Sequence, residues 1–181
     1  MQISFTEFKP EDKDKLVRFL TSERWEFHST PQILAEKIDE QIKKGHYSSS
    51  DIKTFWICAD GSKIGIIRLF DLGDELGSTE TPLFDVRITN QMRGKGIGKQ
   101  AVKWITEYVF TNYPSKNRFE ANTRADNITM RRVLEHCGFV KEAHYRRAWP
   151  DENGNHYDCA GYCILRSDWV NKTKTPVDFN K

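Results

Sequence analysis

The sequence predicts a single mixed α/β domain, and three observations lead to this class. The chain has 181 residues, which is the length of one ordinary domain. Its hydrophobic content of 38% is close to the globular average once glycine is counted, which excludes disordered, collagen-like and fibrous chains. Segments that alternate apolar and polar residues, as strands do, are interleaved with segments of helical spacing. We expect one domain over residues 1–170 and a loose polar tail over residues 171–181.

The first part of the chain predicts a strand followed by two helices. Residues 2–8 alternate in the manner of a strand. Pro10 opens the first helix. A second helix starts at Thr30-Pro31, because a capping residue followed by proline is a typical helix start, and Gly45 ends it.

The remainder of the chain predicts a mixed sheet. The next elements are strands over 54–59, 63–71 and 83–88, a helix over 98–113, a strand over 118–122, a helix from Asn127 to Gly138, and strands over 139–149 and 156–166. Asp85 and Arg87 lie on the opposite face of their strand from Phe84, Val86 and Ile88. Because a strand–helix–strand passage usually joins parallel strands, we expect parallel pairing on the two sides of the helix over 98–113.

Charge, hydropathy and cysteine spacing exclude several classes of protein. Lysine plus arginine exceed aspartate plus glutamate by only two, so we expect no direct nucleic-acid binding. No export signal is visible at the start, and the longest apolar patch, 64–70, is interrupted by Arg68 and too short for a bilayer. The four cysteines lack the spacing of zinc or redox motifs. We expect a cytoplasmic protein with reduced thiols and no membrane contact.

A glycine cluster over residues 90–99 is the most distinctive segment. Three alternate glycines let the backbone approach a ligand closely, and the helix that follows presents free amides and a positive dipole end. Four basic residues lie nearby, and no acidic residue occurs between 86 and 106: Arg93, Lys95, Lys99 and Lys103. The segment fits neither the Walker pattern nor the dinucleotide fingerprint, but it fits R-x-x-G-x-G. It predicts a phosphate or pyrophosphate site; the alternative is a tight turn that binds nothing.

This segment resembles the loop with which the GNAT superfamily of N-acetyltransferases holds the pyrophosphate of acetyl-CoA. Two further matches follow in the family's order, Asn127 with the Gly138-Phe139 helix ending, and the end segment with Gly154, Tyr157-Asp158 and residues 164–169. With Trp25 and Phe27-His28, the chain is similar to the branch containing ribosomal-protein N-terminal-alanine acetyltransferases. The resemblance implies a mixed, mostly antiparallel sheet flanked by helices, with parallel strands splayed around the cofactor arm.

The resemblance also implies which residues hold the cosubstrate, acetyl-CoA. The backbone amides that hold its pyrophosphate would be those of Arg93, Gly94, Lys95, Gly96, Ile97, Gly98 and Lys99. Val86 and Ile88 would pair their backbone with the pantetheine arm, and Asn127 would bond to the arm from the other side. An amide on the 83–88 strand would polarise the thioester carbonyl.

An amine attacks a thioester only after losing a proton, so the site needs a base. Asp85 and Glu80 are the candidates, because both belong to an acidic stretch over 71–85 that would attract a cationic amine; the alternative is an exposed acidic loop. We expect partial desolvation to raise the pKa of the base. The family's usual general-acid positions hold Leu134 and Met130 here. The acid is therefore open between Thr129, Tyr145 and solvent.

Acceptor recognition is expected from Trp25, His28 and Tyr145. A buried aromatic residue is the alternative for Trp25, and His28 relays a proton or serves the structure. Strand alternation separates His156 from Cys159 and Cys163, so we expect no metal. The leading hypothesis is an acetyl-CoA-dependent N-acetyltransferase that acts directly on a primary amine, such as a protein N-terminus, a polyamine or an aminoglycoside. The alternative is a catalytically silent acyl-CoA-binding sensor or interaction module.

Overall fold

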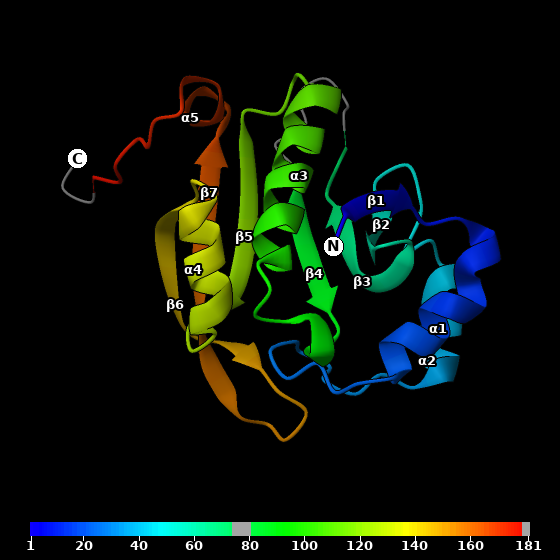
Figure 1. Cartoon of the computed structure of the whole chain (residues 1–181). Coiled ribbons are helices and arrows are strands. Elements are labelled where there is room, and N and C mark those ends of the chain that lie inside the picture. The colour runs from blue at the N-terminus through cyan, green and yellow to red at the C-terminus, as the bar shows by residue number, and fades with distance from the viewer. Residues whose placement is uncertain (74–80, 179–181) are drawn as a thin grey trace.

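One seven-stranded sheet runs through the protein in the order β1-β2-β3-β4-β5-β7-β6 (Figure 1). The computed structural model describes residues 1–73 and 81–178. The strands are β1 (Ile3–Glu7), β2 (Lys53–Ala59), β3 (Ser62–Phe70), β4 (Leu83–Ile88), β5 (Arg118–Arg124), β6 (Val140–Pro150) and β7 (His156–Leu165). Among these strands β4 and β5 are parallel neighbours and the other pairs are antiparallel. The predicted class, a mixed and mostly antiparallel sheet with flanking helices, is confirmed.

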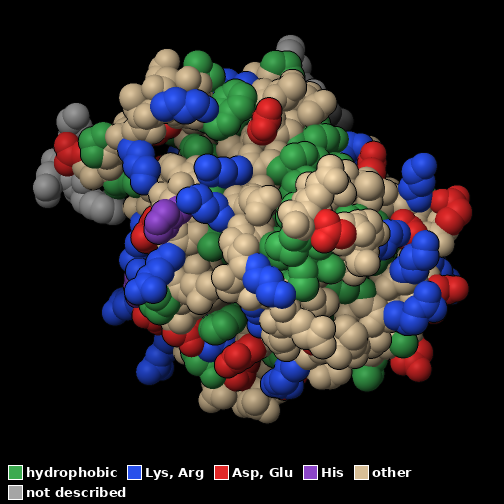
Figure 2. All heavy atoms as spheres, viewed as in Figure 1, with side chains coloured by type: hydrophobic (Ala, Val, Ile, Leu, Met, Phe, Trp, Pro, Cys, Tyr) green, Lys and Arg blue, Asp and Glu red, His purple; other side chains and the backbone are tan. Residues whose placement is uncertain are grey.

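Helices cover both faces of this sheet. They are α1 (Lys13–Thr21), α2 (Ala35–Lys43), α3 (Ile97–Asn112), α4 (Ile128–His136) and α5 (Arg166–Asn171), with short 3-10 turns η1 (Pro10–Asp12) and η2 (Asn90–Met92). Figure 1 shows α3 and α4 in front of the sheet. Figure 2 shows acidic and basic side chains interspersed over this face. None of the described helices is long and apolar enough to cross a membrane.

Strand alternation divides the interior into two hydrophobic cores. On one face, Ile67 of β3 packs in a cluster with Ile105 and other residues of α3. On the other face, Trp56 of β2 packs with Leu16 of α1 and Ile38 of α2. Because successive residues of a strand point to opposite faces, β2 and β3 contribute buried side chains to both cores.

The parallel strands β4 and β5 are the least extensively paired neighbours in the sheet. Leu83 and Glu120 are the one pair in register between these strands, whereas β5 and β7 are paired at seven positions. The strands separate beyond Leu83, which leaves backbone groups of β4 free on the side that faces β5. The predicted splaying of the two parallel strands is confirmed, and it sets the location of the site described below.

Two predicted helix starts differ from the structure by several residues, and one helix was not predicted. The segment at Pro10 forms η1, and α1 follows from Lys13. The second helix begins at Ala35, not at Thr30. Helix α5 was not predicted; it begins at Arg166, whose guanidinium donates to the carbonyls of three residues far away in the sequence, Phe110, Tyr113 and Lys116.

The C-terminal segment is held to the domain as far as Thr175, so the expectation of a loose tail from residue 171 is wrong for this part. Asp168 is only 3% exposed. Its carboxylate accepts hydrogen bonds from the hydroxyl of Thr173 and from both the amide and the hydroxyl of Thr175. A buried carboxylate needs such donors, and these donors lie in the segment that composition alone marks as polar tail.

Asp12 links the start of α1 to the sheet, and its replacement should change acid stability. A hydrogen bond from Lys63 lowers its pKa to about 2 against the effect of burial, and Lys15 and the indole of Trp56 contribute further. Because the folded-state pKa lies below the ordinary value of 3.8, the stabilisation is complete above about pH 5 and is lost progressively as the pH falls towards about 1. Asp12→Asn should lower the free energy of unfolding by about 2 kcal/mol at pH 7, with a much smaller difference near pH 2.

Denaturant unfolding of wild type and variant at several pH values measures this difference. Glu107→Gln, at an exposed position in the middle of α3, is the matched control and should follow the wild-type curve. A difference for Asp12→Asn that is the same at pH 2 and pH 7 would show that the carboxylate charge is not responsible.

Candidate active site

The predicted glycine loop joins β4 to α3 through η2. Gly94 and Gly96 have φ angles of 76° and 75°, in the left-handed region that costs glycine least, and Gly96 caps α3. A Cβ atom at either position would meet no atom within 4 Å. Arg93 Nε donates to the carbonyl of Ile88 at 3.0 Å, which ties the loop to β4. The loop is therefore anchored, and its backbone is open to a ligand.

The amino end of α3 offers the groups that bind a pyrophosphate. The first amides of a helix have no carbonyl partner within it, and the helix dipole places a partial positive charge there. The side chains of Arg93, Lys95 and Lys99 are exposed around the same turn. These features together fit a doubly charged phosphate chain.

A cavity of about 430 Å³ lies where β4 and β5 separate. Val86 of β4 and Thr123 of β5 line its two strand sides, and Asn127 lines it at the start of α4. Asn127 accepts a hydrogen bond from the Met130 amide and donates one to the Thr123 hydroxyl, each at 3.2 Å. Its cap fixes the start of α4 beside the cavity and leaves one amide hydrogen free for a ligand.

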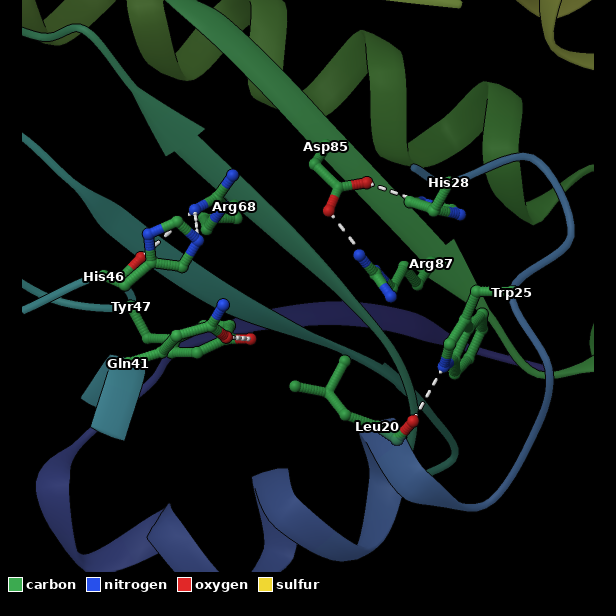
Figure 3. A network of polar contacts seen from close by, with 9 residues as sticks. All are labelled: Leu20, Trp25, His28, Gln41, His46, Tyr47, Arg68, Asp85 and Arg87. Atoms are coloured by element: carbon green, nitrogen blue, oxygen red, sulfur yellow. Dashed lines mark hydrogen bonds and ion pairs between the residues drawn. The ribbon is translucent and has the colours of Figure 1, made fainter. Parts of the chain in front are cut away.

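Asp85, His28 and Arg87 form a polar group in the cavity wall (Figure 3). His28 Nε2 lies 2.8 Å from Asp85 Oδ1, and Arg87 Nε donates to Asp85 Oδ2 at 3.2 Å. The other ring nitrogen, His28 Nδ1, is buried and has no hydrogen-bond partner among the described residues. A carboxylate at Nε2 favours the tautomer with the hydrogen on that nitrogen. Nδ1 then keeps a lone pair that can accept a proton.

The pKa of Asp85 is shifted in the direction opposite to the one expected. Burial would raise its pKa, but Arg87, His28 and Arg68 outweigh burial and hold the pKa well below its ordinary value. The expectation of a raised pKa is therefore wrong. An ionised carboxylate engaged by two partners is a poor base, and it is well suited to orient the His28 ring.

A second arginine enters the cavity from β3. Arg68 is paired in register with Asp85, and its Nη1 bonds to the ring and the carbonyl of His46. Burial, together with the charge of Arg68, lowers the pKa of His46 to about 4, so this ring is neutral at pH 7. Arg68 is recognisable in the sequence only as a charged residue that interrupts an apolar strand, and no sequence pattern links it to Asp85 or His46.

The other predicted residues lie in different places. Trp25 is fully buried and its indole donates to the Leu20 carbonyl, so the prediction that it contacts the acceptor is wrong; it packs behind His28 and Arg87. Tyr145 is exposed on β6, outside the cavity lining. Glu80 lies outside the described residues. No group of three His, Cys, Asp or Glu residues that could hold a metal occurs in the described ranges.

The two positions at which the family usually places its general acid hold apolar side chains here. Leu134 is fully buried in the core, and Met130 lines the cavity.

Tyr47 also lines the cavity, and its hydroxyl donates to Gln41 at 3.2 Å. Burial raises the pKa of Tyr47. Its place in the site was not predicted, because the polar segment that contains it reads as an ordinary loop.

The sheet, the anchored glycine loop and the cavity between splayed parallel strands agree with the family comparison. A model of the GNAT acetyltransferase domain matches residues 2–140. Since this match covers most of the chain, the protein belongs to the GNAT acetyltransferase family, and the predicted family is confirmed.

Two curated relatives come from Bacillus subtilis (strain 168). "Probable N-acetyltransferase YjcK" is 29% identical over 109 residues, covering 60% of this chain and 54% of that protein. "Putative ribosomal N-acetyltransferase YdaF" is 30% identical over 110 residues, covering 61% and 57%. The matched segment thus spans about half the length of these relatives.

Solved structures share the fold at low sequence identity. The spermidine N-acetyltransferase of Vibrio cholerae, in complex with CoA and spermine, superposes with a TM-score of 0.77 at 20% identity, covering 94% of this chain and 99% of that one. A GNAT-family acetyltransferase of Streptococcus pneumoniae superposes with a TM-score of 0.72 at 19% identity, covering 91% and 99%.

Proposed function

We propose that this protein is an acetyl-CoA-dependent N-acetyltransferase that transfers the acetyl group directly to a primary amine. The observation that carries this proposal is the gap between β4 and β5, with the open glycine loop beside the end of β4 and the partly buried His28–Asp85 pair in the wall of its cavity. A fold relative crystallised with CoA and a polyamine is consistent with both ligand classes.

The glycine loop is the proposed site for the pyrophosphate of acetyl-CoA. Amides from Arg93 to Lys99 would donate to the phosphate oxygens at the amino end of α3. The free edge of β4 at Val86 and Ile88 would pair with the amide groups of the pantetheine arm, and Asn127 would donate from the α4 side. An amide of β4 would then polarise the thioester carbonyl, as an oxyanion site requires.

His28 is the proposed base, with Asp85 as its positioning residue. The incoming ammonium gives a proton to His28 Nδ1, directly or through one water, while Asp85 holds the ring through Nε2. The neutral amine nitrogen bonds to the thioester carbon, the nitrogen then gives its second proton to solvent, and the carbon–sulfur bond breaks with its electron pair on sulfur. Tyr145 and Thr129 are exposed and outside the cavity lining. The proposed proton source for the thiolate, whose pKa is about 8.5 in free thiols, is therefore solvent.

Initial-rate kinetics test the proposed direct transfer, in which no covalent acetyl-enzyme intermediate forms. Burial raises the pKa of the Cys163 thiol to about 12, and it also raises the pKa values of Cys159 and Cys137. Because the thiolate is the nucleophilic form, these cysteines are poor acetyl carriers. We expect intersecting initial-rate lines and no thiol release without an amine. A stable acetyl-cysteine trapped by mass spectrometry during turnover would contradict direct transfer.

A further inference from the structure

We infer that the acceptor amine carries a carboxylate close to its amino group, and that Arg68 binds this carboxylate with help from Arg87. This inference rests on the proposed function and specifies its substrate class. It distinguishes this site from one built for polyamines, which carry only positive charge.

The described lining of the cavity is rich in positive charge. It contains three cationic side chains, Lys37, Arg68 and Arg87, and one carboxylate, Asp85. That carboxylate is already engaged by His28 and Arg87. Asp71, the other described carboxylate near Arg68, is not part of the lining. The expected anionic attraction for a cationic acceptor is therefore absent from the described lining.

Arg68 is partly buried and has no carboxylate partner of its own. Its hydrogen-bond partner is His46, which is neutral at pH 7, and no acidic oxygen of the described residues lies within ion-pair distance of it. Burial lowers the pKa of Arg68, which reflects the cost of a desolvated cation. A partly desolvated guanidinium gains from an anionic partner, so Arg68 is suited to bind a ligand carboxylate in the cavity that it lines.

Arg87 provides a second, independent donor. Its Nε is used by Asp85, but its Nη1 is buried and has no hydrogen-bond partner among the described residues. A buried donor without a partner is costly, and a ligand oxygen would remove this cost. Figure 3 shows Arg68 and Arg87 on either side of Asp85.

The distance from Arg68 to the proposed base, His28, determines how far apart the carboxylate and the amino group of the acceptor must lie. Arg68 is directly opposite Asp85 on the neighbouring strand, and Asp85 contacts His28. Neighbouring strands are about 4.8 Å apart, so an anion at Arg68 would lie roughly one to two strand spacings from the reacting amine. γ-Amino acids, and peptides with an acidic residue next to the amino end, can place their charges at this separation.

Calorimetry on the protein saturated with CoA tests the inference without any turnover. Two acceptor pairs differ by one negative charge: Ala-Glu amide against Ala-Gln amide, and γ-aminobutyrate against 4-aminobutanamide. Spermidine serves as the polycation. We expect the carboxylate member of at least one pair to bind about 10- to 100-fold more tightly than its neutral partner. The pair that responds distinguishes a peptide amino terminus from a small amine.

Variants of Arg68 assign the preference to this residue. Arg68→Gln should bring the affinities for the carboxylate acceptor and its neutral partner to within about threefold of each other. Arg68→Lys should restore part of the difference because the positive charge returns. Arg18→Gln, at an exposed position on α1, is the matched control and should keep the wild-type ratio. Thermal melting confirms that each variant is folded at the temperature of the binding experiment.

Equal or weaker binding of the carboxylate members by wild type, or tighter binding of spermidine, would overturn the inference. An unchanged ratio in folded Arg68→Gln would also overturn it. Failure of the proposed function gives a different result, in which the acceptors bind with the carboxylate preference but release no thiol from acetyl-CoA.

Discussion

Replacing His28 by glutamine is expected to lower kcat by about 10²- to 10⁴-fold, the usual range for loss of a general base. His28 Nδ1 is a buried imidazole nitrogen without a hydrogen-bond partner among the described residues, and Asp85 fixes the ring from the other side. Steady-state kinetics with saturating acetyl-CoA measure the effect. His156→Gln, at an exposed position on β7, is the matched control and should keep the wild-type kcat.

Asp85→Asn should produce a loss in the same range, because an amide does not hold the imidazole tautomer and charge that a carboxylate holds. If the two residues act as a unit, the double variant should lose no more than the more impaired single variant. Removal of the carboxylate also leaves Arg87 and Arg68 without it, so folding must be checked by thermal melting. A wild-type rate and pH profile in both single variants would place the base elsewhere.

Gly96→Val should weaken CoA binding by at least about 100-fold, which corresponds to the loss of two charge-assisted hydrogen bonds. The φ angle of Gly96 is 75° and its Cβ position is open. A side chain would therefore project into the space where a pyrophosphate must touch the backbone. Isothermal titration with CoA measures the change.

The backbone strain of that substitution needs its own control. Gly61, in the turn between β2 and β3, has a φ angle of 82°, and its Cβ position is also free of neighbours within 4 Å. Gly61→Val should therefore cost similar stability and leave CoA affinity unchanged. A Gly96→Val protein that is folded and binds CoA with wild-type affinity would remove the glycine loop from the cofactor site.

Local patterns were sufficient to predict the strand face of Asp85 and the placement of the glycine loop. Because side chains alternate between the two faces of a strand, Asp85 and Arg87 are expected on the same face of β4. Closely spaced glycines followed by apolar residues at helical spacing predict a loop that leads into a helix. The splaying of β4 and β5 was implied by the family resemblance, since no property of residues 83–88 or 118–122 alone reports it.

The set of residues that line the cavity between β4 and β5 could not be predicted, because it depends on contacts between segments distant in the sequence. The register of β3 on β4 brings Arg68 opposite Asp85, and the α1–α2 connection brings His28 to the same carboxylate. The sequence alone shows an acidic stretch around Asp85. In the structure two arginines and a histidine surround this residue and lower its pKa, which is why we propose it as a positioning residue and not as the base.

Acetyl transfer itself is tested most directly by incubating the protein with acetyl-CoA and a panel of primary amines, including the carboxylate-bearing and polycationic acceptors named above. CoA thiol and N-acetylated amine are measured in the same samples. We predict equal amounts of the two products, above the amine-free rate, for at least one amine. Tight CoA binding with no acetylated product from any amine would contradict the transferase and identify the chain as a catalytically silent acyl-CoA-binding module.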